Sequence, residues 1–291
     1  MKQALCSISS NAEVMPGIHL MWIEAPDIAV AAQPGQFITV RCGDFTLRRP
    51  FSIHRVGDNN VIACEATQSQ VAILFRVAGK GTLWLAQRQA GDRIDVLGPL
   101  GNGFTIGPKS KNLLLVAGGI GIAPLVFLMQ QASSRHQITL IHGAGTAAQV
   151  CPFSSASRKR NKLSPLPNGV QFIPVTEDGS MGQKGKATDV LPDYLDWADQ
   201  VYACGPVGMY KAMTSSLNPS PLKGEEKGEG EKRSKLKLRK CQVSLEVRIG
   251  CGFGACYGCT INTKKGLRQV CRDGPVFELD DIIWQEVRIW P

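Results

Sequence analysis

The pattern of hydrophobic and polar positions changes near residue 105 of the chain. From residue 1 to 104, apolar and polar residues alternate in short runs that are separated by turn residues. Alternation with a period of two is typical of strands with one buried face, and a succession of such strands predicts an antiparallel barrel or sandwich. Examples are residues 18–26, 35–43, 60–66 and 92–98.

From residue 105 to 217 the pattern is that of strands alternating with helices. The apolar run LLLVA at 113–117 predicts a buried strand, a glycine-rich turn follows it, and residues 123–134 have the composition of a helix. Further strands are expected at 137–145, 172–178 and 199–206. This alternation predicts a doubly wound parallel sheet, which binds ligands at the carboxyl ends of its strands.

Two polar segments interrupt these patterns. Residues 151–168 are expected to form a loop insert in the second domain, and residues 218–240, rich in charge, Gly and Pro, a flexible linker. A small cysteine-rich domain is expected to follow. The predicted division is 1–104 for the barrel, 105–217 for the α/β domain, 218–240 for the linker and 241–291 for the last domain.

The composition excludes some functions. Of 291 residues, 43% are hydrophobic and 20% charged, as in ordinary globular proteins. The net charge is +9, but residues 158–162 and 223–240 carry eight of these charges, so the rest of the chain gives no footprint for nucleic acid. The uncharged stretch 113–129 holds three glycines and Pro124, which favour a strand, a turn and a helix start over a membrane span. Because the N-terminus has no apolar signal segment, we expect a cytoplasmic location.

Four of the ten cysteines lie close together. Cys251, Cys256, Cys259 and Cys271 have the spacing C-x4-C-x2-C-x11-C, whose first three members match a plant-type [2Fe–2S] site. Interspersed glycines let the backbone curl around such a cluster. A structural zinc ion held by four thiolates, or unligated thiols, are the alternatives. The cysteines without this spacing are expected to be small hydrophobic residues: Cys6, Cys42, Cys64, Cys151 and Cys241.

Two further segments could hold a nucleotide. The sequence GGIGIAP at 118–124 follows a predicted strand, and glycines there let a diphosphate approach the backbone. The sequence CGP at 204–206 ends the fourth predicted strand, where open α/β sheets bind ligands. Either segment could also be an ordinary turn. The candidate residues are Gly118, Gly119, Gly121, Cys204, Gly205 and Pro206.

The first domain contains candidate flavin contacts. Arg49, Pro50, Phe51 and Ser52 are expected to end a strand, where the arginine can pair with a flavin diphosphate and the phenylalanine can border its ring. The sequence GKGT at 79–82 could add backbone N–H donors, or form only a hairpin turn.

Taken in order, these motifs resemble the ferredoxin–NADP reductase superfamily. The motifs are RPFS, LFRVAGKGT (74–82), GPLGNGF (98–104), GGIGIAP, YACGP (202–206) and the four cysteines. Within the superfamily the chain is most similar to the electron-transfer subunit of NAD-dependent, class 1B dihydroorotate dehydrogenase. Residues 244–260 and 268–284, with Asp-Gly-Pro-Val-Phe after the last cysteine, carry that similarity, and the two inserts depart from it.

The resemblance implies a flavin barrel, an NAD domain and a [2Fe–2S] domain, with FAD and the cluster as cofactors and NAD as co-substrate. Cys251, Cys256, Cys259 and Cys271 would hold the cluster. FAD would be bound by Arg49, Pro50, Phe51, Ser52, Leu74, Phe75, Arg76, Gly81 and Thr82.

The resemblance also implies a partner. The family works as a heterotetramer with an FMN-containing subunit that oxidises dihydroorotate, so no residue of this chain is expected to catalyse that step. FAD must lie between NAD and the cluster, because nicotinamide exchanges two electrons and the cluster one.

Two other functions remain open at this point. The chain could be a flavin and iron–sulfur reductase that serves a hydrogenase, a sulfide dehydrogenase or an oxygenase. It could also be a zinc protein that binds nucleic acid, although the near-neutral charge outside the inserts and the 7% aromatic content argue against this.

Overall fold

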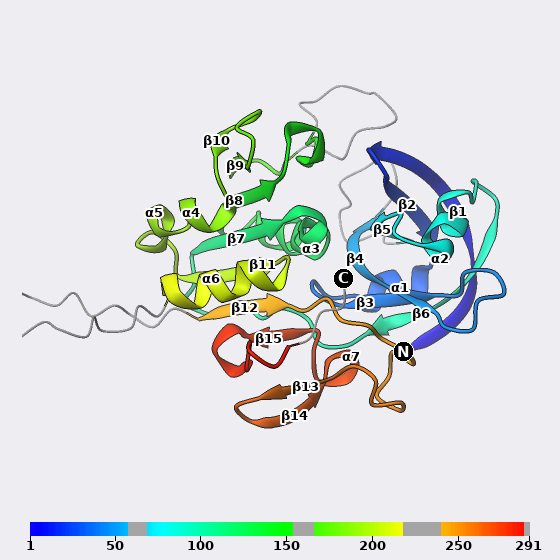
Figure 1. Cartoon of the computed structure of the whole chain (residues 1–291). Coiled ribbons are helices and arrows are strands. Elements are labelled where there is room, and N and C mark those ends of the chain that lie inside the picture. Colours follow the sequence, from blue (N-terminus) through cyan, green and yellow to red (C-terminus); the bar gives the residue numbers. More distant parts are fainter. Residues whose placement is uncertain (58–68, 154–165, 218–239, 288–291) are drawn as a thin grey trace, which may run out of the picture.

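The computed structural model describes residues 1–57, 69–153, 166–217 and 240–287. They form a closed barrel, a seven-stranded sheet flanked by helices, and a two-stranded hairpin. Figure 1 shows the barrel in blue and cyan, the sheet mainly in green and yellow, and the C-terminal segment in orange and red below them. The expected fold class, an antiparallel barrel beside a mainly parallel sheet, is confirmed.

The barrel is closed by six antiparallel strands in the order β1-β2-β5-β4-β3-β6. Alternate residues of these strands point inward, where Ile23, Ile38 and Ile73 are fully buried. The expected strand at 60–66 lies outside the described residues. The barrel elements are β1 (Lys2–Met15), β2 (Ile18–Glu24), α1 (Pro26–Ala31), β3 (Phe37–Val40), β4 (Arg49–Gly57), β5 (Gln70–Arg76), α2 (Lys80–Ala86) and β6 (Arg93–Leu100).

The large sheet has the order β10-β9-β8-β7-β11-β12-β15, in which only β15 runs antiparallel to its neighbour. The sequence patterns did not indicate β12 and β15, which come from the C-terminal segment and are too short to show a period. The strands are β7 (Asn112–Gly118), β8 (Gln137–Ala144), β9 (Val170–Thr176), β10 (Gln183–Lys184), β11 (Gln200–Cys204), β12 (Cys241–Ser244) and β15 (Val276–Glu278).

Helix α3 joins the sheet to the barrel. It is apolar on nearly all sides because it lies between β7 and β4. Three hydrogen bonds fix this contact: His54 Nδ1 donates to the Ala123 carbonyl (3.0 Å), Gln130 Nε2 donates to the Val56 carbonyl (2.8 Å), and the Val56 N–H donates to Gln130 Oε1 (3.4 Å). The other elements of this part are η2 (Gly119–Gly121), α3 (Ile122–Ala132), η3 (Ala147–Gln149), α4 (Ala187–Val190), α5 (Pro192–Leu195) and α6 (Val207–Leu217).

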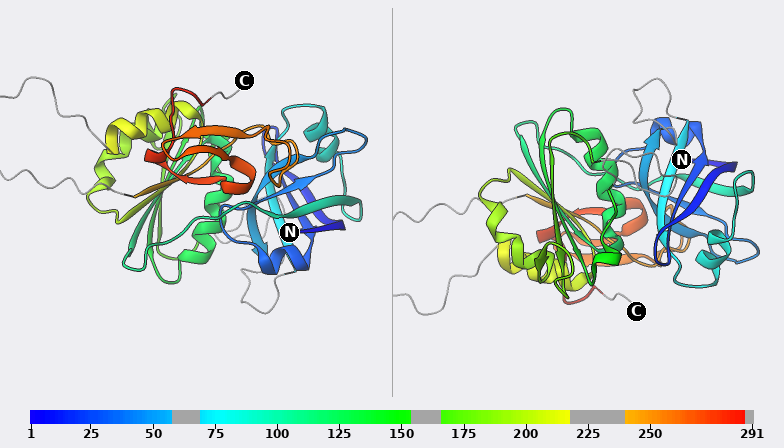
Figure 2. Two further views of the ribbon diagram at one scale, coloured as in Figure 1. Left: turned by 90° about the horizontal axis from the view of Figure 1, so that it is seen from below. Right: turned by 90° about the horizontal axis from the view of Figure 1, so that it is seen from above.

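The C-terminal segment crosses both larger parts. After β12 it runs to the barrel, where Gly252 approaches Thr39 and Leu100, and it returns to the sheet as β15. Seen from below, the orange segment extends from the sheet to the barrel (Figure 2). Its further elements are β13 (Thr260–Thr263), β14 (Gly266–Gln269), α7 (Val270–Asp273) and η4 (Leu279–Asp281). No helix in the described ranges is long and apolar enough to cross a membrane.

Candidate functional site

A cavity of about 980 Å³ lies where the barrel, the turn after β7 and the C-terminal segment meet. Its size is that of a large cofactor site. Ile120 and Ala123 line it from the turn, and residues 244–249 and 258–262 line it from the C-terminal segment. Seven of the nine predicted flavin residues line it from the barrel: Arg49, Pro50, Phe51, Ser52, Leu74, Phe75 and Arg76.

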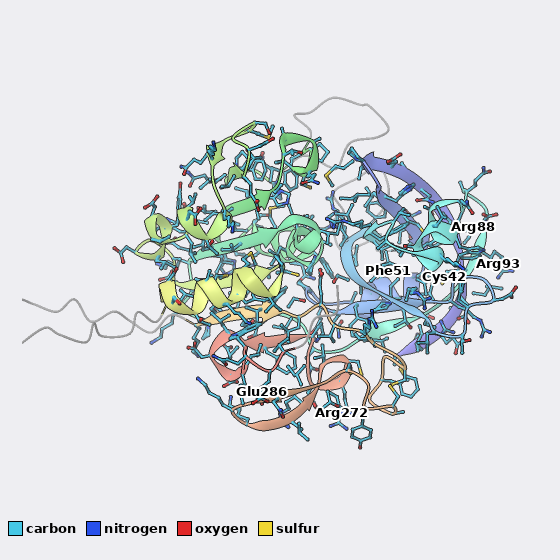
Figure 3. The ribbon with its side chains drawn as sticks, in the orientation of Figure 1. Cys42, Phe51, Arg88, Arg93, Arg272 and Glu286 are labelled. Carbon is cyan, nitrogen blue, oxygen red and sulfur yellow. The ribbon has the colours of Figure 1, made fainter. Side chains whose placement is uncertain are left out.

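The segment Arg49–Ser52 begins strand β4, and the expectation that it would end a strand is wrong. It pairs antiparallel with β3, so the register fixes each side chain: Val40 lies opposite Arg49 and Phe37 opposite Ser52. Phe51 packs against Phe75, with 5.5 Å between ring centroids. Figure 3 shows Phe51 on the side of the barrel that faces the sheet.

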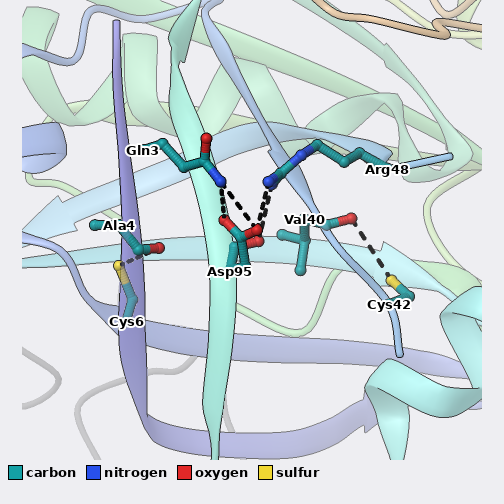
Figure 4. Close-up of polar contacts among 7 residues, drawn as sticks. All are labelled: Gln3, Ala4, Cys6, Val40, Cys42, Arg48 and Asp95. Carbon is teal, nitrogen blue, oxygen red and sulfur yellow. Dashed lines mark hydrogen bonds and ion pairs between the residues drawn. The ribbon is translucent and has the colours of Figure 1, made fainter. Parts of the chain in front are cut away.

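The two arginines at this point have different partners. Arg48 forms an ion pair with Asp95 at 2.5 Å, and Gln3 donates to the same carboxylate (Figure 4). Arg49 donates to the Leu47 carbonyl (2.6 Å), and its guanidinium pairs with no carboxylate in the described part of the chain. Arg49 is therefore a cation of the cavity wall that is free to pair with an anionic group, and its contact with a flavin diphosphate stays a prediction.

Gly81 and Thr82 do not line the cavity themselves. Thr82 Oγ1 accepts hydrogen bonds from the N–H groups of Ala78 (2.9 Å) and Gly79 (3.1 Å), which closes the turn before α2. A Cβ atom on Gly81 would lie 2.9 Å from Arg49 Nε, so the glycine makes room for that side chain. A direct contact of these two residues with FAD stays a prediction.

The predicted nucleotide residues of the sheet come together at its switch point, where strand order reverses between β7 and β11. Ala117 pairs with Cys204, so the two strands end at the same edge. A Cβ atom on Gly121 would lie 2.1 Å from the Cys204 carbonyl oxygen, and one on Gly118 would lie 2.7 Å from Pro206 Cδ. Glycine is required here because the two segments touch through their backbones.

His142 supports this turn, a specific role that the sequence analysis did not assign to it. Its Nε2–H donates to the Gly119 carbonyl (3.0 Å), and its Nδ1 accepts from the Cys151 N–H (3.3 Å). Burial lowers the pKa of His142 to about 4, so the ring is neutral at physiological pH. Gly119 itself has φ +55°, a left-handed conformation that suits glycine.

Glu246 is a second residue that the sequence analysis missed. Its carboxylate is exposed to the cavity, and Cys204 Sγ lies 3.9 Å from Oε1. The surrounding protein raises the pKa of Glu246, and the nearby Arg76 guanidinium and Cys204 thiol oppose that rise. The one acidic residue in the apolar stretch SLEVRI was the available signal.

The four predicted cluster ligands lie close enough to affect one another's pKa. The Cys256 thiol interacts with Cys251, and the Cys271 thiol with Cys259. Among the described residues, no three His, Cys, Asp or Glu side chains surround a single point where one ion could bind. A [2Fe–2S] cluster held by these four thiolates, two on each iron, stays a prediction.

The backbone of the cluster loop places N–H donors next to the cysteine sulfur atoms. Gly252 and Gly254 have φ near +90°, and the chain curls so that the Ala255 N–H points at Cys251 Sγ (3.3 Å). Burial raises the pKa of Cys251, but backbone N–H groups and the Cys256 thiol outweigh it and lower the pKa to about 6. Burial and the Cys259 thiol raise the pKa of Cys271 to about 12.

The cysteines outside this cluster lie apart from it. Cys64 falls outside the described residues. The others, as expected, are buried: Cys6, Cys42, Cys151 and Cys241.

Comparison with known proteins identifies the parts. Residues 246–283 match the iron–sulfur cluster binding domain of dihydroorotate dehydrogenase B, and residues 115–215 match the oxidoreductase NAD-binding domain. A solved NADH-dependent reduced ferredoxin–NADP oxidoreductase, described for flavin-based electron bifurcation, is 26% identical, with a TM-score of 0.75 over 97% of this chain and 91% of the other.

Two curated relatives extend over most of the chain. The electron transfer subunit of dihydroorotate dehydrogenase B (NAD(+)) from Desulforamulus reducens is 37% identical and covers 94% of this chain and 95% of its own length. That from Geobacillus thermodenitrificans is 35% identical and covers 88% and 89%. The chain belongs to the family of electron transfer subunits of NAD(+)-dependent dihydroorotate dehydrogenase B.

Proposed function

We propose that this chain passes electrons between NAD(H) and an FMN-containing partner subunit through FAD in the cavity and a [2Fe–2S] cluster on the four cysteines. One observation carries the proposal. Cys259, a predicted cluster ligand, lines the same cavity as the flavin motif Arg49–Ser52 and as Ile120 from the nucleotide turn. Residues of the three sites that must exchange electrons therefore line the same cavity.

FAD, when bound, exchanges two electrons with a nicotinamide and single electrons with a cluster. The chain's own residues bind and orient the flavin and the nucleotide. Arg49 holds the flavin diphosphate, and Phe51 and Phe75 border the ring from the barrel. The turn at Gly118–Gly121 lets a dinucleotide diphosphate approach the backbone beside the start of α3. Glu246 and Arg76 add further charged groups to the cavity wall.

The partner follows from the names of the relatives, which are electron transfer subunits of dihydroorotate dehydrogenase B. We assign dihydroorotate oxidation to that partner, in a cytoplasmic heterotetramer of two chains of each kind, with NAD+ as the acceptor in pyrimidine biosynthesis. The cluster face supports docking there, because the predicted ligand Cys256 is exposed between exposed Phe253 and Tyr257. Electrons would leave or enter through that face.

Electron paramagnetic resonance of the anaerobic chain after addition of NADH tests this function. We expect the signal of a reduced [2Fe–2S] cluster, because the nucleotide, flavin and cluster sites are connected. A signal with dithionite but none with NADH would contradict the assigned path. The isolated chain should not oxidise dihydroorotate, and FMN-free turnover of that substrate would contradict the assignment to a partner.

A further inference from the structure

The segment Gly101–Thr105, which follows β6, touches all three parts of the molecule. It contains the end of the motif GPLGNGF, to which the proposed function gives no role. It leaves the barrel at Leu100, which pairs with Phe37, a residue that lines the cavity. The segment therefore starts at the cavity wall.

Asn102 binds the chain immediately after the last predicted cluster ligand. Its Nδ2 donates to the carbonyls of Arg272 (3.2 Å) and Asp273 (3.1 Å), and its backbone N–H donates to the Gly274 carbonyl (2.5 Å). These three carbonyls directly follow Cys271. The barrel thus holds the buried end of the cluster site through one exposed side chain and one backbone group.

Gly101 brings the two chains close enough for these bonds. It has φ +73°, and a Cβ atom there would lie 2.5 Å from the Gly274 carbonyl oxygen and 2.6 Å from Pro275 Cδ. On the other side of the cluster loop, a Cβ atom on Gly252 would meet Thr39 and Leu100 at 3.2 Å. The cluster segment therefore rests on the barrel at two points.

The other end of the segment is fixed to the nucleotide sheet. The Thr105 carbonyl accepts from Gln200 Nε2 (2.9 Å) and Tyr202 Oη (3.0 Å), and the Thr105 N–H donates to Gln242 Oε1 (2.9 Å). Phe104 packs edge-on against Tyr202, with 5.5 Å between ring centroids. The three side chains that hold Thr105 are buried, so this anchor is firm.

We propose that Gly101–Thr105 is a strut that sets the separation between the flavin cavity and the cluster, with Asn102 as its positioning residue. This inference rests on the proposed function. Electron transfer between two centres slows steeply as their separation grows, so a contact that fixes Cys271 against the barrel acts on that rate. Asn102 touches neither centre and acts only through the backbone of residues 272–274.

The test uses the full chain with its cofactors and the variant Asn102→Asp. The isosteric change replaces the Nδ2 donor with an oxygen that faces two carbonyls. Because Asn102 is exposed, the change opens no cavity in the core. Asn11→Asp is the control, since Asn11 Nδ2 likewise donates to backbone carbonyls, those of Leu85, Ala86 and Arg88, within the barrel and away from the cluster segment.

Absorbance measures the reduction of the flavin by NADH, and freeze-quench electron paramagnetic resonance measures the reduction of the cluster. Both midpoint potentials and the iron content are determined for each variant. Because electron transfer slows steeply as the two centres move apart, we expect Asn102→Asp to slow cluster reduction severalfold. Flavin reduction, the flavin potential and the iron content should stay as in the parent. Asn102→Asp adds a negative charge near the cluster, which lowers the cluster potential by itself, so the cluster potential is compared in Gly101→Ala, which adds no charge. Gly101→Ala, which pushes the same two chains apart, should also slow cluster reduction.

Three results would overturn the strut. The first is a parental rate of cluster reduction in both variants. The second is a slower rate accompanied by lost iron in either variant, or by a shifted cluster potential in Gly101→Ala, which would mean that the segment acts on the cluster itself. The third is an equal slowing in Asn11→Asp. If the parent chain gives no cluster signal with NADH, the proposed function fails, and the parent reports this before any variant is compared.

Discussion

The cluster loop and the nucleotide edge are both rich in glycine, but they use it for opposite purposes. In the cluster loop, Gly252 and Gly254 supply left-handed conformations, which let nearby N–H groups turn toward sulfur. At the nucleotide edge, Gly118 and Gly121 have ordinary φ angles, and what they supply is the absence of a side chain. The first region needs a backbone shape. The second needs space at Gly118 and Gly121, and only Gly119 between them takes a left-handed conformation.

The difference decides how each region fails. The ligands of the cluster loop lie within 21 consecutive residues, so damage there removes a ligand and leaves the sheet intact. The nucleotide edge is a contact between segments more than 80 positions apart, and Gly121 lies against the backbone of Cys204. A larger side chain there pushes β7 away from β11 and disturbs the packing of the buried core.

The largest effect should come from Gly121→Ala. The new Cβ would lie 2.1 Å from the Cys204 carbonyl oxygen and 2.7 Å from the Gly205 nitrogen, both backbone atoms that cannot move alone. We expect a loss of about 3 kcal/mol or more in the free energy of unfolding, and no reduction by NADH. Thermal denaturation and anaerobic absorbance measure the two.

Gly208→Ala is the control for that variant. Gly208 lies in α6 with no atom within 4 Å of a new Cβ, so alanine should leave stability unchanged or slightly raised. Parental behaviour of Gly121→Ala would refute the claim that this edge depends on close backbone contact.

Cys259→Ala should give the complementary result. It removes one of four thiolates, so iron content should fall to background and transfer to a partner should stop. The flavin spectrum and its reduction by NADH should persist, because the barrel and the nucleotide edge are untouched. Iron analysis and absorbance measure both, and Cys6→Ala, at a buried cysteine of the barrel, should keep its iron. Loss of FAD together with iron would break the contrast between the two regions.

A smaller contrast lies within the cavity wall. Arg49→Ala should weaken FAD binding by about tenfold to a hundredfold, the value of one lost charge-assisted contact. Arg48→Ala should cost about 1 kcal/mol of stability, because its guanidinium is paired with Asp95. Flavin titration of the stripped protein and thermal denaturation separate the two effects. Equal loss of FAD affinity in both variants would contradict the assignment of Arg49 to the diphosphate.

The smallest effect concerns pH. The pKa of His142 is lowered to about 4 by burial, so the unfolded chain takes up a proton near pH 6.5 that the folded chain refuses. The contribution of neutral His142 to the free energy of unfolding is therefore fully present above pH 6.5 and is lost as the pH falls toward 4. His142→Gln should therefore show a shallower fall in Tm between pH 7 and 5 than the parent. Parallel curves would contradict this account.

The sequence alone was informative where a site is local. The cysteine spacing indicated the cluster segment, and the run LLLVA with its glycine turn indicated the nucleotide edge. Both signals could be recognised because each depends only on residues that are close together in the sequence. It failed for the direction of Arg49–Ser52, which follows from pairing with β3 rather than from the segment itself.

Residues that act across parts could not be predicted. Asn102, His142 and Glu246 each meet partners that only tertiary packing brings near. Strands β12 and β15 have four and three residues, too few for a period. β12 forms because β11 offers a free side to pair with, and β15 pairs in turn with β12.

The pairing of β12 has a consequence for how the chain can be divided. Four residue pairs join β12 to β11, and three join it to β15, so the C-terminal segment is held in the sheet by hydrogen bonds that do not depend on the connection before it. A chain interrupted between α6 and β12 retains every one of these bonds. Two separately produced fragments, ending and beginning at that interruption, should therefore complement each other into one active molecule.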